Sequence, residues 1–99
     1  MKQMIDLVNS FPVIAKRFGG GIKEWNADYI TSKDGLIVDY SLLSSGGRAV
    51  IDFALLVWNW DTDWKVYGFQ DFNLAHAFAF WDEGQREAFR AWTRDPFFP

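Results

Sequence analysis

The sequence predicts an α+β domain with an N-terminal helix, a four-stranded antiparallel β-meander, and a C-terminal helical region packed on one face of the sheet. Three observations lead to this prediction. Apolar residues first recur three and four positions apart, then alternate with polar residues, and return to helical spacing near the C-terminus. With 99 residues the chain has the length of one domain, 1–99.

The N-terminal segment, residues 2–18, carries an apolar stripe with helical spacing. The stripe consists of Met4, Leu7, Val8, Phe11, Ile14, Ala15 and Phe18. Pro12 interrupts it, so we expect either a kink or a second helix that begins near Pro12. The glycines 19–21 follow a helix rather than precede one. They therefore indicate the end of the helix and not a phosphate-binding loop.

The first two predicted strands lie on either side of a turn. Polar and apolar residues alternate over 24–29, and Leu36, Val38, Tyr40 and Leu42 fall on one face of the next strand. The intervening Ser32–Gly35 predicts a hairpin turn with a positive φ at Gly35.

The last two predicted strands form a second hairpin. Ser44–Gly47 predicts a turn, and residues 48–60 predict a central strand because both of its faces are apolar. Asp61–Asp63 predicts the next turn, and Trp64–Phe69 the returning strand. Aromatic residues then lie on both faces of this hairpin, so one face meets solvent or a partner.

The C-terminal region predicts helices. Residues 74–81 fit a short helix, although a two-residue period also fits them. Asp82 with Gln85 resembles a capping box and predicts a helix over 83–94 that buries Ala88, Phe89 and Trp92. Asp95-Pro96 ends this helix.

No catalytic or metal-binding motif is found in the sequence, and we expect no cofactor and no enzymatic activity. The chain has no cysteine, and we expect its one histidine, His76, to lie in the core or at its boundary. Asn59, Asp61 and Asp63 have the spacing of a calcium loop. Trp64 stands where that loop needs glycine, however, so we interpret the two aspartates as solvated turn residues.

The aromatic content of 19% is large for a core of this size and favours a partly uncovered interaction surface. Ordinary surface exposure of apolar atoms is the alternative. Six acidic residues and one base, Lys65, lie between residues 49 and 85, together with most of the aromatic side chains. Since tryptophan, tyrosine and arginine dominate interface energetics, this half of the chain is typical of a surface that binds a basic partner.

Arg86, Arg90 and Arg94 lie four residues apart on the last predicted helix. They form either a salt-bridged solvated face or a basic stripe that docks on an acidic partner. The candidate partner-binding residues are thus Trp58, Trp60, Asp61, Asp63, Trp64, Tyr67, Arg86, Arg90 and Arg94.

These patterns favour a small non-enzymatic protein-binding module that inhibits a host or toxin protein by steric blocking. Phage anti-defence proteins, such as anti-CRISPR proteins, and the immunity proteins of toxin nucleases share this size, charge and lack of catalytic motifs. The expected partner is a basic nucleic-acid-binding protein or complex. A net charge of −3 argues against direct binding of nucleic acid.

Two other functions stay open. An apolar pocket between sheet and helices would make a small-molecule sensor or carrier, with His76 and Tyr40 as polar contacts. A homodimer would also cover the excess apolar surface. We expect a cytoplasmic protein, because Asp6 interrupts the first apolar segment and no apolar run approaches the roughly 20 residues that span a membrane.

Overall fold

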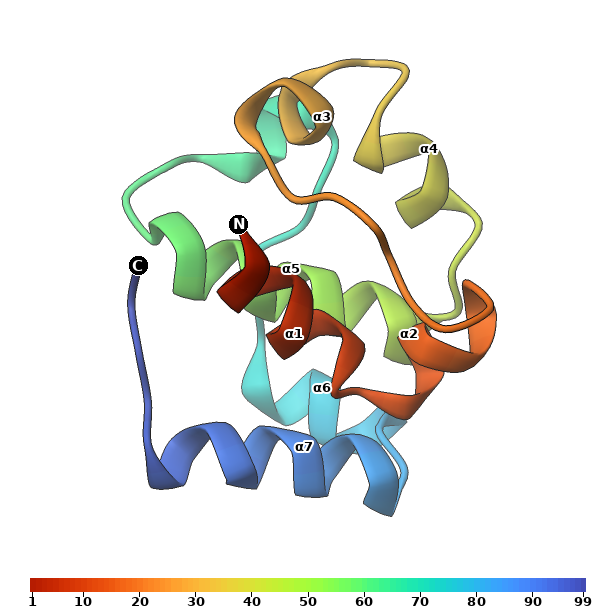
Figure 1. Ribbon diagram of the computed structural model, residues 1–99, viewed down its shortest axis with the longest axis vertical. Coiled ribbons are helices and arrows are strands. Elements are labelled where there is room, and N and C mark those ends of the chain that lie inside the picture. Colours follow the sequence, from red (N-terminus) through yellow and green to blue (C-terminus); the bar gives the residue numbers. More distant parts are fainter.

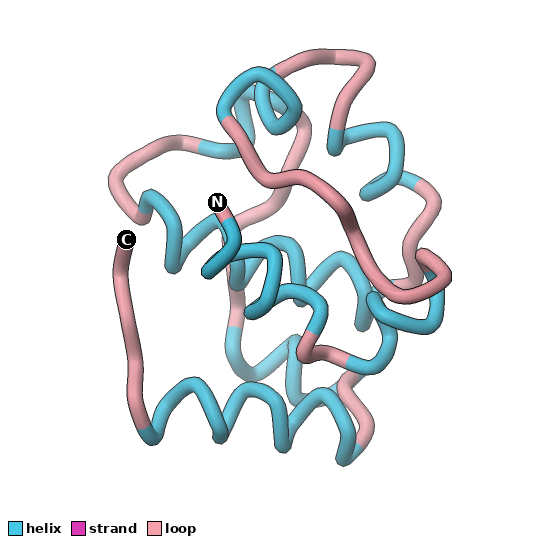
Figure 2. Tube along the Cα trace, viewed as in Figure 1, coloured by secondary structure: helices cyan, strands magenta, loops and turns pink.

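The computed structural model describes residues 1–99 and consists of helices joined by turns and loops, with no strand (Figure 2). The predicted α+β fold and its four-stranded meander are therefore wrong. In chain order the elements are α1 (Lys2–Asn9), α2 (Pro12–Arg17), α3 (Ala27–Thr31), α4 (Leu36–Ser41), α5 (Ser45–Asn59), the 3₁₀ helix η1 (Trp64–Tyr67), α6 (Leu74–Phe80) and α7 (Glu83–Arg94).

Helix α5 runs through the middle of the molecule, and the other elements surround it (Figure 1). It packs against α1, α2, α4 and α6. Helices α3 and α4 pack together at the top of this view, whereas α7 lies at the bottom and contacts α2. The C-terminal segment rises from α7 toward the N-terminus, so the two chain ends lie on the same side in this view.

The predicted central strand, 48–60, is wrong, because residues 48–59 belong to α5 and Trp60 follows the helix. The Ser44 hydroxyl caps this helix by accepting a hydrogen bond from the Gly47 amide at 3.3 Å, so the predicted second turn is a helix start. Seven consecutive residues, 49–55, are all buried. A helix buried on every side shows no amphipathic period, and its apolar residues then resemble a central strand in sequence.

The first two predicted strands are also short helices. Asn26 caps α3 by accepting a hydrogen bond from the Tyr29 amide at 2.8 Å. In α4, Leu36 and Tyr40 are buried, whereas Val38 and Leu42, the residue that follows the helix, are exposed. Residues four apart share a helical face, so the true period here is 3.6 and not 2.

The turns between these segments join helices rather than strands. Ser32–Gly35 connects α3 to α4, and Gly35 has a φ of −97° instead of the predicted positive value. Glycine is nevertheless needed there, because a Cβ atom would overlap the backbone carbonyl oxygen of Tyr29. Asp61–Asp63 leads from α5 into η1, so the predicted returning strand is wrong as well.

The helices predicted at both ends of the chain are confirmed. The apolar stripe forms α1 and α2, with Pro12 at the start of the second helix, and positive φ angles at Gly19, Gly20 and Gly21 follow it. Residues 74–80 form α6. The Asp82 carboxylate caps α7 by accepting hydrogen bonds from the Gly84 and Gln85 amides at 3.0 and 3.3 Å.

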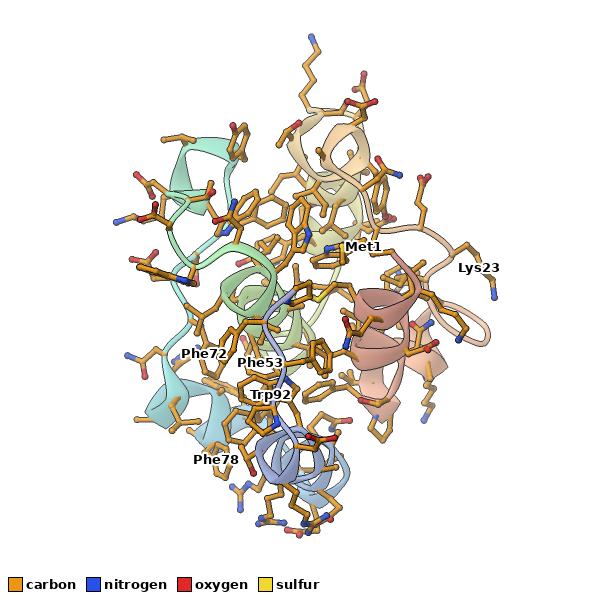
Figure 3. The ribbon with its side chains drawn as sticks, turned by 60° about the vertical axis from the view of Figure 1, so that its left-hand side comes forward. Met1, Lys23, Phe53, Phe72, Phe78 and Trp92 are labelled. Atoms are coloured by element: carbon orange, nitrogen blue, oxygen red, sulfur yellow. The ribbon has the colours of Figure 1, made fainter.

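Aromatic side chains fill the core around Phe53 of α5. The centroid of its ring lies 5.1 to 6.5 Å from the ring centroids of Phe11, Phe72, Trp81, Phe89 and Trp92. Figure 3 shows Phe53, Phe72 and Trp92 gathered between α5 and α7, while Lys23 extends into solvent. The core thus absorbs most of the aromatic residues. Trp60, Tyr67, Phe80 and Phe98 stay exposed.

Candidate protein-binding surface

The C-terminal end of α5 presents apolar side chains to solvent. Leu56 and Trp60 lie four residues apart and are both exposed, and the Trp60 side chain is 70% exposed. Trp60 follows the last residue of the helix, where the chain turns toward η1. Exposure of the large apolar ring of Trp60 to water is unfavourable relative to its burial, so contact with a partner would lower the free energy.

The neighbouring aromatic residues are ordered by the helix end. Trp58 stacks on Trp64 with ring centroids 5.6 Å apart and an angle of 23° between the rings. The Trp64 indole N–H donates to the Asn59 carbonyl oxygen at 3.0 Å, and its ring contacts Tyr67 at 5.8 Å. These contacts hold η1 against the end of α5.

Three acidic residues lie near Trp60, two of them just after it in the chain and the third in the lining of the same hollow. Asp61 and Asp63 are exposed in the turn, and Asp63 also caps η1 by accepting a hydrogen bond from the Lys65 amide at 3.2 Å. Asp71 is exposed and forms an ion pair with Lys65 at 3.4 Å. We call Leu56, Trp60, Asp61, Asp63 and Asp71 the Trp60 surface.

A hollow of about 150 Å³ lies beside this surface. It is lined by Asp52, Leu56, Trp60, Thr62, Trp64, Gln70, Asp71 and Phe72. Asp52 is one of the six acidic residues counted from the sequence between residues 49 and 85, but neither Asp52 nor Leu56 was predicted as a site residue, although a single acid inside the apolar run 49–58 is itself a signal.

The Asp52 carboxylate is the one buried acidic group of the molecule, and its residue is only 7% exposed. Its Oδ1 accepts a hydrogen bond from the Tyr40 hydroxyl at 3.0 Å. The pKa of Asp52 is raised to about 7, chiefly by burial and to a smaller extent by the charge of Asp71. The Tyr40 hydroxyl, the Gln70 backbone and Arg48 act in the opposite direction on this pKa.

The arginine stripe lies apart from the Trp60 surface, because α7 carries it at the bottom of Figure 1. Arg90 forms ion pairs with Glu83 at 2.6 Å and with Glu87 at 3.3 Å, and Arg94 forms one with Glu87 at 3.0 Å. Arg86 donates to the Phe78 carbonyl oxygen. Of the two interpretations given for these arginines, the contacts match the salt-bridged face rather than a free basic stripe.

Two further hollows are shallow and lie elsewhere. One of about 450 Å³ is lined by residues that include Phe18, Lys23 and Tyr29, and one of about 370 Å³ lies between α2 and the start of α7. Neither contains Tyr40 or His76. His76 is exposed against the ring of Phe80 at 4.7 Å, so its predicted core or boundary position is wrong.

The predicted pocket between a sheet and helices does not exist, since the sheet is absent. None of the helices is both long and apolar enough to cross a membrane. No protein-family model, curated protein or solved structure matches this chain.

Proposed function

We propose that the protein is a small non-enzymatic binding module that inhibits a basic host or toxin protein by covering its functional surface. The observation that carries this proposal is the 70% exposure of Trp60 among acidic side chains at the end of a buried helix. The α5 helix is anchored on several sides, so Trp60 projects from a rigid element.

The chemistry of the Trp60 surface supports a basic partner. Tryptophan is among the residue types that most often contribute 2 kcal/mol or more to an interface. Asp61 and Asp63 follow Trp60 in the chain, are exposed and form no ion pair, so they add negative charge that accelerates encounter with a positive surface and disfavours acidic partners. Nucleic-acid-binding proteins carry such positive surfaces. Action in the cytoplasm is part of the proposal, in keeping with a chain that has no cysteine.

The same charges disfavour a homodimer through this surface. A twofold interface brings the same patch of both copies together, so Asp61 and Asp63 of one copy would face the same two aspartates of the other. Like charges at an interface cost several kcal/mol when they are desolvated. A carrier function would lack the two polar contacts expected for it. The buried Tyr40 hydroxyl donates its hydrogen bond to Asp52, and His76 is exposed.

Affinity capture tests the proposal. The tagged protein is incubated with lysate of its natural host in the presence of nuclease, and bound proteins are identified by mass spectrometry. We expect one stoichiometric basic protein, whose activity falls when the purified module is added in equal amount.

Two variants localise the binding. Trp60→Ala and the double variant Asp61→Lys with Asp63→Lys should lose the partner while staying folded. Phe98→Ala is the matched control, because Phe98 is an aromatic residue with 62% exposure and lies outside the Trp60 surface. Equal capture by wild type and Trp60→Ala would refute the site, and capture of no protein would refute the function.

A further inference from the structure

The hollow beside Trp60 has the size of a single side chain. Its volume of about 150 Å³ exceeds the roughly 30 Å³ share of one water molecule. It is smaller than the roughly 300–1,000 Å³ of sites for drug-sized ligands. An extended side chain that enters from the Trp60 surface therefore fits it better than a free metabolite.

The lining divides into an apolar and a polar part. Leu56, Trp60, Trp64 and Phe72 supply apolar and aromatic surface. Asp52, Asp71, Thr62 and Gln70 supply polar groups. Trp64 is already fixed by its hydrogen bond to Asn59 and by stacking on Trp58, so little order is lost when a guest binds.

Asp52 has no ion-pair partner, whereas Asp71 on the other side of the hollow pairs with the exposed Lys65 at 3.4 Å. None of the five ion pairs of the molecule includes Asp52. Arg48, the base nearest to it along α5, donates to the carbonyl oxygens of Tyr40 and Ser41 instead. A buried carboxyl group next to aromatic rings and a second carboxylate is an environment that attracts an ammonium group.

We propose that this hollow receives a lysine side chain of the basic partner, with its ammonium group between Asp52 and Asp71 and its alkyl stem against Trp60 and Leu56. This inference rests on the proposed function for the identity of the molecule that carries the lysine. Lysine suits the site better than arginine, because its compact ammonium group needs no planar bidentate partner. A metal ion lacks ligands here, since no group of three ionisable ligands occurs in the molecule.

Binding in the hollow depends on pH. Tyr40 from α4, Arg48 from α5 and Asp71 with its partner Lys65 are the charged or titratable groups around Asp52. Asp52 loses its proton as the pH rises through about 7, whereas the lysine ammonium group stays charged to about pH 10. Affinity for the ammonium group should therefore rise across this range.

The test uses Nα-acetyl-lysine methylamide as the probe and the neutral norleucine analogue as its apolar match. Binding is followed by NMR of the indole N–H groups of the full-length protein. We expect saturable shifts of the Trp60 and Trp64 signals with the lysine probe and at least tenfold weaker binding of the norleucine probe. Asp52→Asn should weaken lysine binding at least tenfold at pH 8 and abolish its pH dependence.

Asp39→Asn is the matched control, because Asp39 also accepts a hydrogen bond from a tyrosine hydroxyl, that of Tyr29 at 2.6 Å, but lies outside the hollow. Its lysine affinity should equal that of the wild type. Trp60→Ala supplies a second variant that should weaken binding without touching a buried group.

The probe needs no partner protein, so the two proposals fail separately. Equal binding of the lysine and norleucine probes, or unchanged lysine binding in Asp52→Asn, overturns the ammonium site even when Trp60-dependent capture of a partner succeeds. Selective lysine binding that requires Asp52 supports the ammonium site. If no partner is then captured from lysate, the site stands and the proposed function is refuted.

Discussion

Replacement of Asp52 by asparagine should stabilise the protein at neutral and alkaline pH. The change keeps the shape of the side chain and an oxygen that accepts the Tyr40 hydrogen bond, but it removes the buried charge. Because burial raises the pKa of Asp52 from 3.8 to about 7, the folded protein holds a proton there that the unfolded chain releases. The free energy of unfolding of the wild type therefore falls as the pH rises from about 4 to 7.

The size of the effect follows from this difference in pKa. A difference of about 3 units at about 1.4 kcal/mol each gives an upper limit of about 4 kcal/mol. Water in the adjoining hollow screens the charge, so we expect about 2 kcal/mol. The asparagine also places an N–H₂ group where the carboxylate faces the Gln70 backbone, at a cost of about 1 kcal/mol that does not depend on pH.

Urea unfolding of wild type and Asp52→Asn at pH 4 and pH 8, followed by tryptophan fluorescence, separates these two effects. The cost of the altered hydrogen bond appears at both pH values and cancels in the comparison. The stability of the variant relative to wild type should be about 2 kcal/mol greater at pH 8 than at pH 4. A relative stability that is the same at both pH values, within 0.5 kcal/mol, would refute the buried-charge argument.

Three further changes test the packing of the fold by urea unfolding. Phe53→Ala should lower the free energy of unfolding by about 3–5 kcal/mol, because Phe53 is the centre of the aromatic core; a loss below 1 kcal/mol would contradict this. Gly35→Ala should cost about 2–3 kcal/mol, since the new Cβ atom meets the Tyr29 carbonyl oxygen, and unchanged stability would show that the turn relaxes freely. Asp82→Ala removes the cap of α7 and should cost about 1 kcal/mol, whereas Asp82→Asn should restore most of it.

The sequence predicts those helices that carry explicit boundary signals. Pro12 marks the start of α2, three glycines follow it, and Asp82 caps α7. Helices α3 and α4 have five and six residues, and over so short a span an alternating pattern and a helical one share most of their apolar positions. The exposure of Val38 and Leu42 distinguishes the two periods, and it is visible only in the structure.

The candidate site, too, was predicted from the sequence only in part. Trp58, Trp60 and Trp64 are neighbours in the sequence, so their grouping survives the change from a hairpin to a helix followed by η1. Asp52 joins them only through the helical register of α5, because a strand would place it more than 20 Å from Trp60 at ~3.3 Å per residue. The helix brings both to one hollow. Because residues 48–60 were predicted as a strand, Asp52 was not recognised as part of the site.

The affinity of the captured partner for wild type and for Trp60→Ala, measured by isothermal titration calorimetry, tests the central claim most directly. A residue at the centre of an interface contributes about 2 kcal/mol or more, which corresponds to a roughly 30-fold change in Kd. We predict at least this loss for Trp60→Ala and less than a threefold change for Phe98→Ala. Equal affinities of wild type and Trp60→Ala would show that the partner binds elsewhere on the molecule.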